Sequence, residues 1–564
     1  MPVAEKKTRH YQPSEFLKAL SLSPQDMSRL AFCNSNKASV VKNWADALKA
    51  TQIYQTSIQL YKALPDLLCL KTDAKTRLEM LESLRPAVFS AADGLSKDFL
   101  NQSLVLPEQA QKAAVMAQSM QKFLADGYCL CVRDMISGKR LKAQQGQLMA
   151  TAIQRAIHAI AHIFMRNYQL YTQTAPSLWR KLHQLYLVAE HYDLVATKVV
   201  GQSPLEKRST TIGNTYLSAL MLASSKANQV SQRDVEHIFS QLPEWSVAAS
   251  LEPGPSQDRE NIWLVDLNGD EAPRYKMDFK ASSNSIILEL NLKSLVSLIA
   301  KQGGVSSDTL GGNHNVTIAA TFPRPLIHHL LDAWGHVSQR QLKRTQVQSV
   351  AEVSVGLSDS HYCLANKTDF SAFLEQCGID EAAHNVSAFR GSLDIVDHLD
   401  QRAMHRVSLK DVSTGGAKLF WSGASSTKVQ AGELLCFKEL GKSSWSLGLV
   451  RWIRKFKAGA QLGVQIVSNK AIAIAVAQVH SSGAVAEYSR GILIPGDRYG
   501  GSVTSAITAA IPFKEGDTID MVDGQRQSKL ILDECIFANT SIRQFNLSGG
   551  PDLDQSEQAS QRWS

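Results

Sequence analysis

The spacing of apolar residues changes once along this chain, and this change constrains the architecture more than any other feature. Across residues 1–250, apolar side chains recur every three or four positions, as in the stripe Ile153, Ile157 and Ile160, which is typical of amphipathic helices. Across residues 345–478, apolar residues alternate in short runs separated by Gly, Ser and Lys turns, which is typical of antiparallel strands. We therefore expect an α+β multidomain protein.

Breaks in this pattern divide the chain into its expected parts. The stretch EPGPSQD, residues 252–258, ends the helical region. The later short strands have the spacing of a closed barrel, which leaves no strand edge exposed. The expected parts are a helical bundle at 1–250, a small α/β segment at 251–335, an antiparallel β-barrel at 336–480 with an insertion at 359–399, a small β module at 481–550 and a disordered tail at 551–564.

Composition narrows the class of protein. The 564 residues are 44% hydrophobic and 20% charged, which is typical of globular proteins. The formal net charge of +8 is too small for this length to indicate a nucleic-acid-binding face by itself. The eight cysteines are scattered without a CxxC pair and predict reduced thiols. The N-terminus does not resemble a signal peptide, and the most apolar run, residues 471–479, is too short to span a bilayer. We expect a cytoplasmic protein.

An arginine pair precedes the first expected barrel strand. Arg340 and Arg344 lie four residues apart on a polar lead-in, and the alternating run begins directly after them. Guanidinium groups bind phosphate oxygens through paired hydrogen bonds, and they also stack on purines or donate to them. The pair therefore predicts a site for a phosphorylated ligand.

The second expected strand, in KDVSTGGAKLF, carries a matching set of polar residues. Asp411 and Ser413 alternate, so they lie on one face of a strand, and Val412 is expected to face the core. A carboxylate and a hydroxyl can accept hydrogen bonds from the donor edge of a base. Gly415 and Gly416 permit a bulge or the close approach of a ligand.

In this order, the two motifs resemble those of the PilZ domain family. The resemblance covers the expected barrel, residues 336–480, and it implies binding of cyclic di-GMP without catalysis. The arginines would bind phosphate and guanine, and the Asp/Ser/Gly strand would meet the other face of the guanine. The implied ligand-binding residues are Arg340, Arg344, Asp411, Ser413 and Gly416.

A second arginine pair offers an alternative. The motifs are separated by 66 residues, at 345–410, more than is usual in the family, and the insertion accounts for the excess. Only four residues, 407–410, separate the rival pair, Arg402 and Arg406, from Asp411, too few for a strand and a hairpin return. Arg340 and Arg344 are therefore preferred. The alternative interpretation of the preferred pair is a solvated basic cap at the C-terminus of the preceding helix, with no role in ligand binding.

Other candidate sites are weaker. His158 and His162 share one helical face, and His183 and His191 follow on the next helices, but no carboxylate or cysteine lies at a supporting spacing. We therefore expect no metal. The glycine-rich residues 303–315 lack the Lys-Ser/Thr ending of a P-loop, and no GxSxG or HExxH motif occurs. The sequence thus gives no sign of an enzyme or of a bound cofactor.

The preferred interpretation is a non-enzymatic receptor that couples cyclic di-GMP binding to a helical domain with a protein partner. Two other classes stay open. A scaffold whose barrel has lost its ligand predicts no effect of the nucleotide on stability. A nucleic-acid-binding protein would use the basic rim at 451–457 and predicts strong salt dependence.

Overall fold

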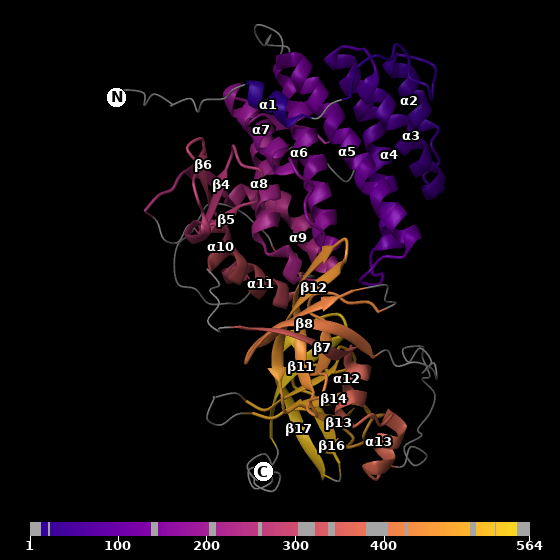
Figure 1. Cartoon of the computed structure of the whole chain (residues 1–564), viewed down its shortest axis with the longest axis vertical. Coiled ribbons are helices and arrows are strands. Elements are labelled where there is room, and N and C mark those ends of the chain that lie inside the picture. The colour runs from indigo at the N-terminus through magenta and orange to yellow at the C-terminus, as the bar shows by residue number, and fades with distance from the viewer. Residues whose placement is uncertain are drawn as a thin grey trace. The chain divides into compact units, whose positions relative to one another are not determined.

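Figure 1 shows the structure of the chain, which is a computed structural model. The chain forms two compact units, Met1–Gln339 and Arg340–Ser564. The first is mainly helical and the second is mainly β, which confirms the expected α+β class. The structure describes residues 13–20, 23–136, 145–201, 210–257, 262–302, 318, 322–336, 344–379, 404–422, 427–496, 503–524 and 526–549.

Helices build most of the first unit. Several begin with side-chain caps, such as Asp73, which accepts hydrogen bonds from two backbone N–H groups of the helix that follows it. The helices are α1 (Pro13–Ala19), α2 (Ala38–Asp46), α3 (Ile53–Cys69), α4 (Ala74–Phe99), α5 (Glu108–Ile136), α6 (Gly146–Gln169), α7 (Leu178–His191), α8 (Ile212–Ser224) and α9 (Gln232–Trp245). The short strands β1 (Lys198–Val199) and β2 (Thr210–Thr211) pair with each other.

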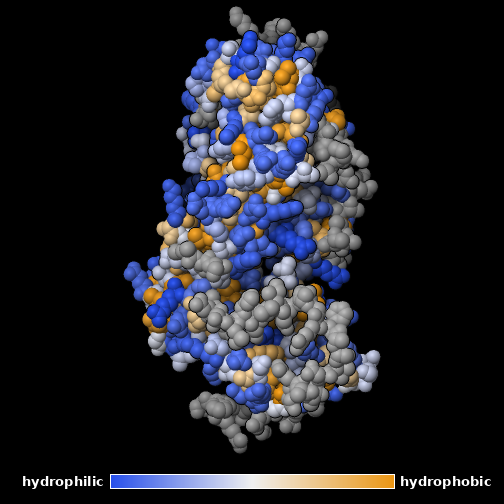
Figure 2. Space-filling model, turned by 90° about the vertical axis from the view of Figure 1, so that its right-hand side faces the viewer, coloured by the Kyte–Doolittle hydropathy of each residue, from blue (hydrophilic) through white to orange (hydrophobic). Residues whose placement is uncertain are grey.

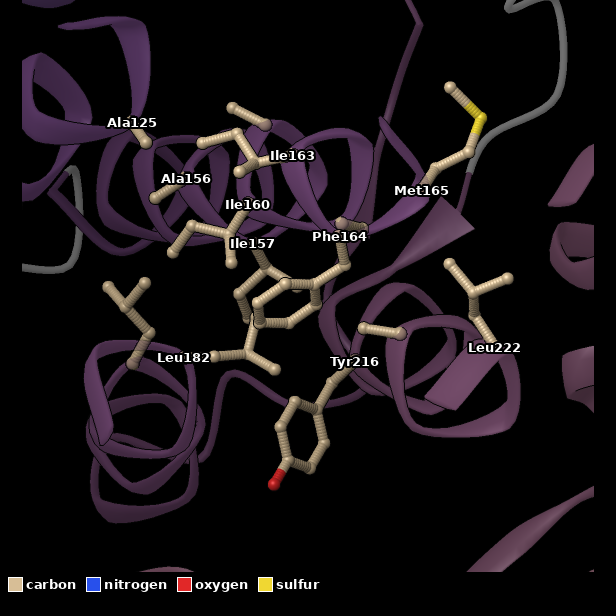
Figure 3. Close-up of a cluster of buried hydrophobic side chains, with 14 of the residues drawn as sticks. Ala125, Ala156, Ile157, Ile160, Ile163, Phe164, Met165, Leu182, Tyr216 and Leu222 are labelled. Atoms are coloured by element: carbon tan, nitrogen blue, oxygen red, sulfur yellow. The ribbon is translucent and has the colours of Figure 1, made fainter. Parts of the chain in front are cut away.

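The apolar stripe of α6 lies in the core of this unit. Ile157, Ile160 and Phe164 are fully buried, and Figure 3 shows them beside Leu182 of α7 and Tyr216 of α8. Among the described residues, α6 is the one helix long and apolar enough to cross a membrane, but most of its apolar stretch is buried inside the unit. Its place in the core accounts for that apolarity.

A small sheet and two helices complete the first unit. In the sheet, β6 lies between β3 and β4, and β5 pairs with β4. Trp263, Leu290 and Leu330 from this region belong to the same hydrophobic core as the helices. The elements are β3 (Ser250–Pro253), β4 (Trp263–Asp266), β5 (Arg274–Tyr275), β6 (Ile287–Asn291), α10 (Lys293–Gln302) and α11 (Arg324–Gly335).

The turn after β4 attaches this sheet to the helical bundle. The Asp270 carboxylate accepts hydrogen bonds from the backbone N–H groups of Ser177 (2.6 Å) and Arg180 (3.0 Å) at the start of α7. These groups have no partner within the helix, so the carboxylate satisfies them. The break at 252–258 therefore marks a change of element type, whereas the hydrophobic core continues across it.

The second unit begins with a closed barrel of six antiparallel strands. Around the barrel the order is β10, β11, β12, β9, β8 and β7, and β7 closes it by pairing with β10. This arrangement confirms the expected barrel and its antiparallel pairing. Its strands are β7 (Thr345–Val355), β8 (His405–Ser413), β9 (Gly416–Trp421), β10 (Leu434–Glu439), β11 (Ser446–Phe456) and β12 (Gly459–Ser468).

The C-terminal β module is a second closed barrel of six strands, visible at the end of the chain in Figure 1. Numbered one to six in chain order, the strands of both barrels have the same neighbours: 1–2, 2–3, 3–6, 6–5, 5–4 and 4–1. The two barrels therefore share one topology. The second consists of β13 (Ile472–Gln478), β14 (Ser489–Ile494), β15 (Ser505–Ala509), β16 (Thr518–Asp523), β17 (Arg526–Ala538) and β18 (Ile542–Ser548).

The strand β13 differs from its sequence-based assignment. The alternating run at 471–479 was expected to end the first barrel, but β13 pairs with β14 and β16 and opens the second. Apolar alternation predicts that a segment is a strand, and it does not specify which sheet the strand joins.

The insertion between β7 and β8 packs against both barrels. It contains α12 (Leu357–Leu364) and α13 (Phe370–Gln376), and its residues 380–399 lie outside the described residues. Cys363 of α12 shares a buried cluster with residues of both barrels. Phe373 and Leu374 of α13 pack on the outer face of the second barrel. Through α12, the insertion is thus part of the core between the barrels.

Candidate functional site

The motif residues of the second expected strand lie on a β-hairpin. Asp411 and Ser413 are on β8, residues 414–415 form the turn, and Gly416 begins β9. Arg344 directly precedes β7, which pairs with β8. The hairpin and the start of β7 thus bring Arg344 beside Asp411, although many residues separate them in the sequence. Arg340 lies outside the described residues, as does Arg402 of the rival pair.

A bulge sets which way the carboxylate faces. Leu409 pairs with Leu419 inside the barrel, and Asp411 pairs with Lys418, so one extra residue lies between the two pairs. Directly opposite residues share a face of the sheet, so the bulge places Asp411 on the outer face with Lys418. Val412 pairs with buried Ala417 on the inner face.

Asp411 is the centre of an ion triad with Arg344 and Lys418. Arg344 Nη1 lies 2.5 Å from Asp411 Oδ1, and Lys418 Nζ lies 2.7 Å from Oδ2. The Asp411 side chain is 3% exposed, against 23% for Arg344 and 27% for Lys418. Burial acts to raise the pKa of the Asp411 carboxyl, but hydrogen bonds from Lys418 and Arg344 outweigh it and hold the pKa below its usual value. The triad is therefore a shielded carboxylate beneath two accessible cations.

Gly416 allows the triad to pack tightly. A Cβ atom at this position would lie 2.6 Å from the carbonyl oxygen of Val464 and 3.7 Å from Arg344 Nη2. The backbone oxygen cannot move away easily, so a larger residue would displace the strand. Ser413 donates from its hydroxyl to the Gly416 carbonyl oxygen at 3.2 Å. Ser413 and Gly416 thus shape the turn beside the triad.

Two further residues of this face were missed by sequence reasoning. Lys418 could have been found by counting outward from the turn, because a regular hairpin pairs it with Asp411. Trp452 of β11 is opposite Gly463, and a Cβ atom at 463 would lie 2.0 Å from the Trp452 Nε1 atom. The indole therefore lies flat across β12, with Gly463 next to Lys418 in the same cross-strand row. No sequence motif predicts that placement.

Other residues singled out in the sequence have local partners. His158 and His162 pack with Phe89 in the first unit, and Arg85 Nη2 lies 3.3 Å from His158 Nδ1. His183 Nδ1 lies 2.6 Å from the Tyr216 hydroxyl. Within the described ranges, no group of His, Cys, Asp and Glu side chains could hold a metal ion. Residues 303–315 and the tail at 551–564 are outside those ranges.

The basic segment at 451–457 is the end of β11 and the turn after it. Arg451 Nε donates to the side-chain oxygen of Gln465 on the neighbouring strand. Burial lowers the pKa of Lys455 to about 8, which weakens its positive charge near neutral pH. Arg406, the described member of the rival pair, is exposed on β8 opposite Glu352.

Comparison with known proteins gives one consistent result along the chain. Residues 38–256 match the model of the N-terminal domain of the cyclic-di-GMP receptor FimW. Residues 262–394 and 392–472 match the middle PilZ domain of that receptor, and 474–548 match its C-terminal beta-barrel domain. The middle part of the chain, residues 262–472, therefore matches a PilZ domain. The first barrel, which carries Arg344, Asp411 and Gly416, is accordingly the PilZ barrel.

A curated relative extends this similarity over nearly the whole chain. The cyclic-di-GMP receptor FimW of Pseudomonas aeruginosa strain PAO1 is 25% identical over 568 aligned positions, covering 93% of each protein. The PilZ match ends at 472, and the C-terminal barrel match begins at 474. These limits agree with the structure, in which β13 opens the second barrel.

Proposed function

We propose that this chain is a non-enzymatic receptor for cyclic di-GMP that binds its ligand on the outer face of the PilZ barrel. The observation that carries the proposal is the ion triad. The preferred arginine motif and the Asp/Ser/Gly motif meet there, at 2.5 Å between Arg344 and Asp411. The match of the middle region to a PilZ domain and the similarity to a receptor named for cyclic di-GMP support it.

The chemistry of the face suits a ligand with two phosphates and two guanines. Arg344, together with Arg340, supplies guanidinium donors for phosphate oxygens. Asp411 is held ionised and can accept hydrogen bonds from guanine N–H groups. Trp452 presents an indole on which a base can stack, an interaction worth about 1–3 kcal/mol per base. No covalent step is required of any of these residues.

We also propose that the helical unit binds a protein partner in the cytoplasm. Its outer surface carries exposed side chains suited to such a contact, among them Tyr54 and Tyr61 of α3 and Val115 of α5. In Figure 2, apolar groups on the visible face are scattered among hydrophilic side chains, without the continuous apolar band of a membrane-embedded protein. Nucleic acid is a weaker candidate because the basic rim at 451–457 is partly paired and partly buried.

Isothermal titration calorimetry with cyclic di-GMP tests the proposed function. We expect saturable binding that is lost or strongly weakened in Trp452→Ala and retained in Trp445→Ala, a matched indole that lies beside Lys438. Cyclic di-AMP serves as the control for guanine recognition, and we expect it to bind more weakly. Absence of binding by the wild-type protein would favour the scaffold, and binding to RNA with steep salt dependence would favour the nucleic-acid class.

A further inference from the structure

Arg344 and Asp411, which are both proposed to contact the ligand, form an ion pair with each other in this structure. Arg344 occupies Asp411 Oδ1 and Lys418 occupies Oδ2, at 2.5 and 2.7 Å. The carboxylate is almost fully covered, with 3% of its side chain exposed. A guanine can therefore reach Asp411 only after one of the two cations has moved.

The two cations are anchored differently. Lys418 lies within β9, and its backbone is paired with Asp411 on β8 and with Gly463 on β12. Arg344 precedes Thr345, the first residue of β7, so its own backbone is outside the paired strand. Arg344 is thus the cation that can move at lower cost, because residues at a strand end are held by fewer interactions.

We propose that Lys418 is a positioning residue. It holds the Asp411 carboxylate in place while Arg344 leaves that carboxylate and binds the ligand instead. Arg344 moves from Oδ1 to a phosphate oxygen of cyclic di-GMP, and a guanine N–H group takes its place on Oδ1. Lys418 stays on Oδ2 throughout. The carboxylate therefore never loses all its partners, which avoids the cost of a buried unpaired charge. This inference rests on the proposed function.

The exchange makes the ligand affinity depend on the ionisation of Asp411. The charged groups that face this carboxylate from the described parts of the neighbouring strands are Arg344 and Lys418, and its partner on β7, Gln346, is uncharged. A protonated Asp411 can no longer accept two hydrogen bonds as an anion, so affinity falls as the pH drops through its pKa. Removal of Lys418 takes away one of two stabilising charges and shifts this loss to higher pH.

The test is calorimetric titration of the full-length protein with cyclic di-GMP across a pH series, for wild type, Lys418→Met, Lys418→Arg and Lys410→Met. Lys410→Met is the matched control because it removes the same charge from the residue next to Asp411. The Lys410 ammonium lies over the Phe420 ring and not on the carboxylate. Near neutral pH we expect Lys418→Met to bind about ten-fold more weakly, in line with the loss of a charge-assisted contact. Lys418→Arg should restore most of the affinity, and Lys410→Met should match wild type.

The pH series separates positioning from packing. In Lys418→Met the affinity should begin to fall at a higher pH than in wild type, by up to about ten-fold per pH unit for one linked proton. Equal affinities and equal pH profiles in wild type and Lys418→Met would overturn the inference while leaving the receptor function intact. Failure of the wild type to bind would instead remove the proposed function. If Lys418→Met is unfolded by circular dichroism, Lys418→Gln is titrated in its place, with the same expected shift.

Discussion

The two barrels of the second unit have the same strand neighbours but different outer faces. Near the end of its second strand, the PilZ barrel turns Asp411 and Ser413 outward, and Asp411 forms ion pairs with two cations. The last outward residues of the second strand in the other barrel are Ile492 and Ile494, which pack in the cluster between the barrels. One topology thus supports a polar site or an apolar interface, depending on the outward positions of a single strand.

The buried acids Asp411 and Asp520, one in each barrel, also differ in the charge of their partners. Asp411 is paired with two cations, whereas Asp520 of β16 accepts from the neutral Tyr488 hydroxyl at 2.9 Å and from Gln527 at 2.5 Å. The packed apolar residues of α13 lie on that same outer face, beside Tyr488 and Val522. Of the two acids, only Asp411 therefore has a partner that could leave it for a phosphate.

The largest expected effect, on the free energy of unfolding, comes from placing a carboxylate on the outer face of the second barrel. Ile492→Asp places a carboxylate in the buried cluster between the barrels, whose described members are apolar. We expect a loss of several kcal/mol in the free energy of unfolding, because a buried unpaired charge is strongly unfavourable. Urea denaturation measures the loss. Ile536→Asp is the control, since Ile536 is 48% exposed on β17, and equal costs in both variants would contradict the described interface.

Removal of the Arg344 side chain should have the next largest effect. Arg344→Ala is expected to weaken cyclic di-GMP binding by about 10–100-fold, because contacts to charged groups are worth about 1.5–3 kcal/mol. Arg340→Ala should behave alike. Arg406→Ala, which removes an exposed arginine from β8, is the matched control and should bind as wild type. Loss of affinity in the Arg406 variant with none in the Arg344 variant would show that the rival pair is the correct one.

A pH-dependent effect on stability should distinguish Asp411 as an ionised group. An Asp in an unfolded chain has a pKa of about 4. The pKa of Asp411 in the folded protein is below that value. Its stabilising contribution is therefore fully present above the unfolded pKa and is lost as the pH falls through the folded pKa. The difference in unfolding free energy between wild type and Asp411→Asn should be constant from neutral pH to about pH 5 and should shrink below about pH 4. A difference independent of pH would mean that the carboxylate charge is not stabilising.

The smallest expected effect is at Ser413. Its hydroxyl donates to the Gly416 carbonyl oxygen within the turn, and this is a neutral hydrogen bond. Ser413→Ala should reduce the affinity for cyclic di-GMP by about two- to ten-fold, since such bonds contribute about 0.5–1.5 kcal/mol. Thr427→Ala, which removes a hydroxyl paired with His405, controls for a general loss of barrel stability. A loss as large as that of Arg344→Ala would indicate that Ser413 contacts the ligand directly.

Local patterns in the sequence predicted most of this fold and much of the candidate site. Helical stripes such as that of α6 follow from one face being buried, and the hairpin motif places Asp411, Ser413 and Gly416 within a few residues of one another. The proximity of Arg344 and Asp411 could be predicted because the family resemblance assigns the two motifs to one binding site. These features depend on residues close together in the sequence or on a known arrangement of strands.

The features that sequence reasoning missed depend on contacts between distant segments. The assignment of β13 to the second barrel is decided by its partners β14 and β16, which its own alternation does not reveal. The packing of α12 between the barrels and of α13 on the second barrel depends on apolar surfaces that meet only in the folded chain. Trp452 reaches the site because Gly463 leaves space on the next strand.

The buried cluster between the two barrels also determines the smallest fragment that can carry the site. A protein truncated after Ser468 would keep every strand of the PilZ barrel. It would nevertheless leave Leu434, Cys436, Leu447 and Leu449 without the isoleucines of the second barrel that now cover them. Such a continuous apolar surface promotes aggregation in water. The independently soluble ligand-binding fragment should therefore be the entire second unit, Arg340–Ser564.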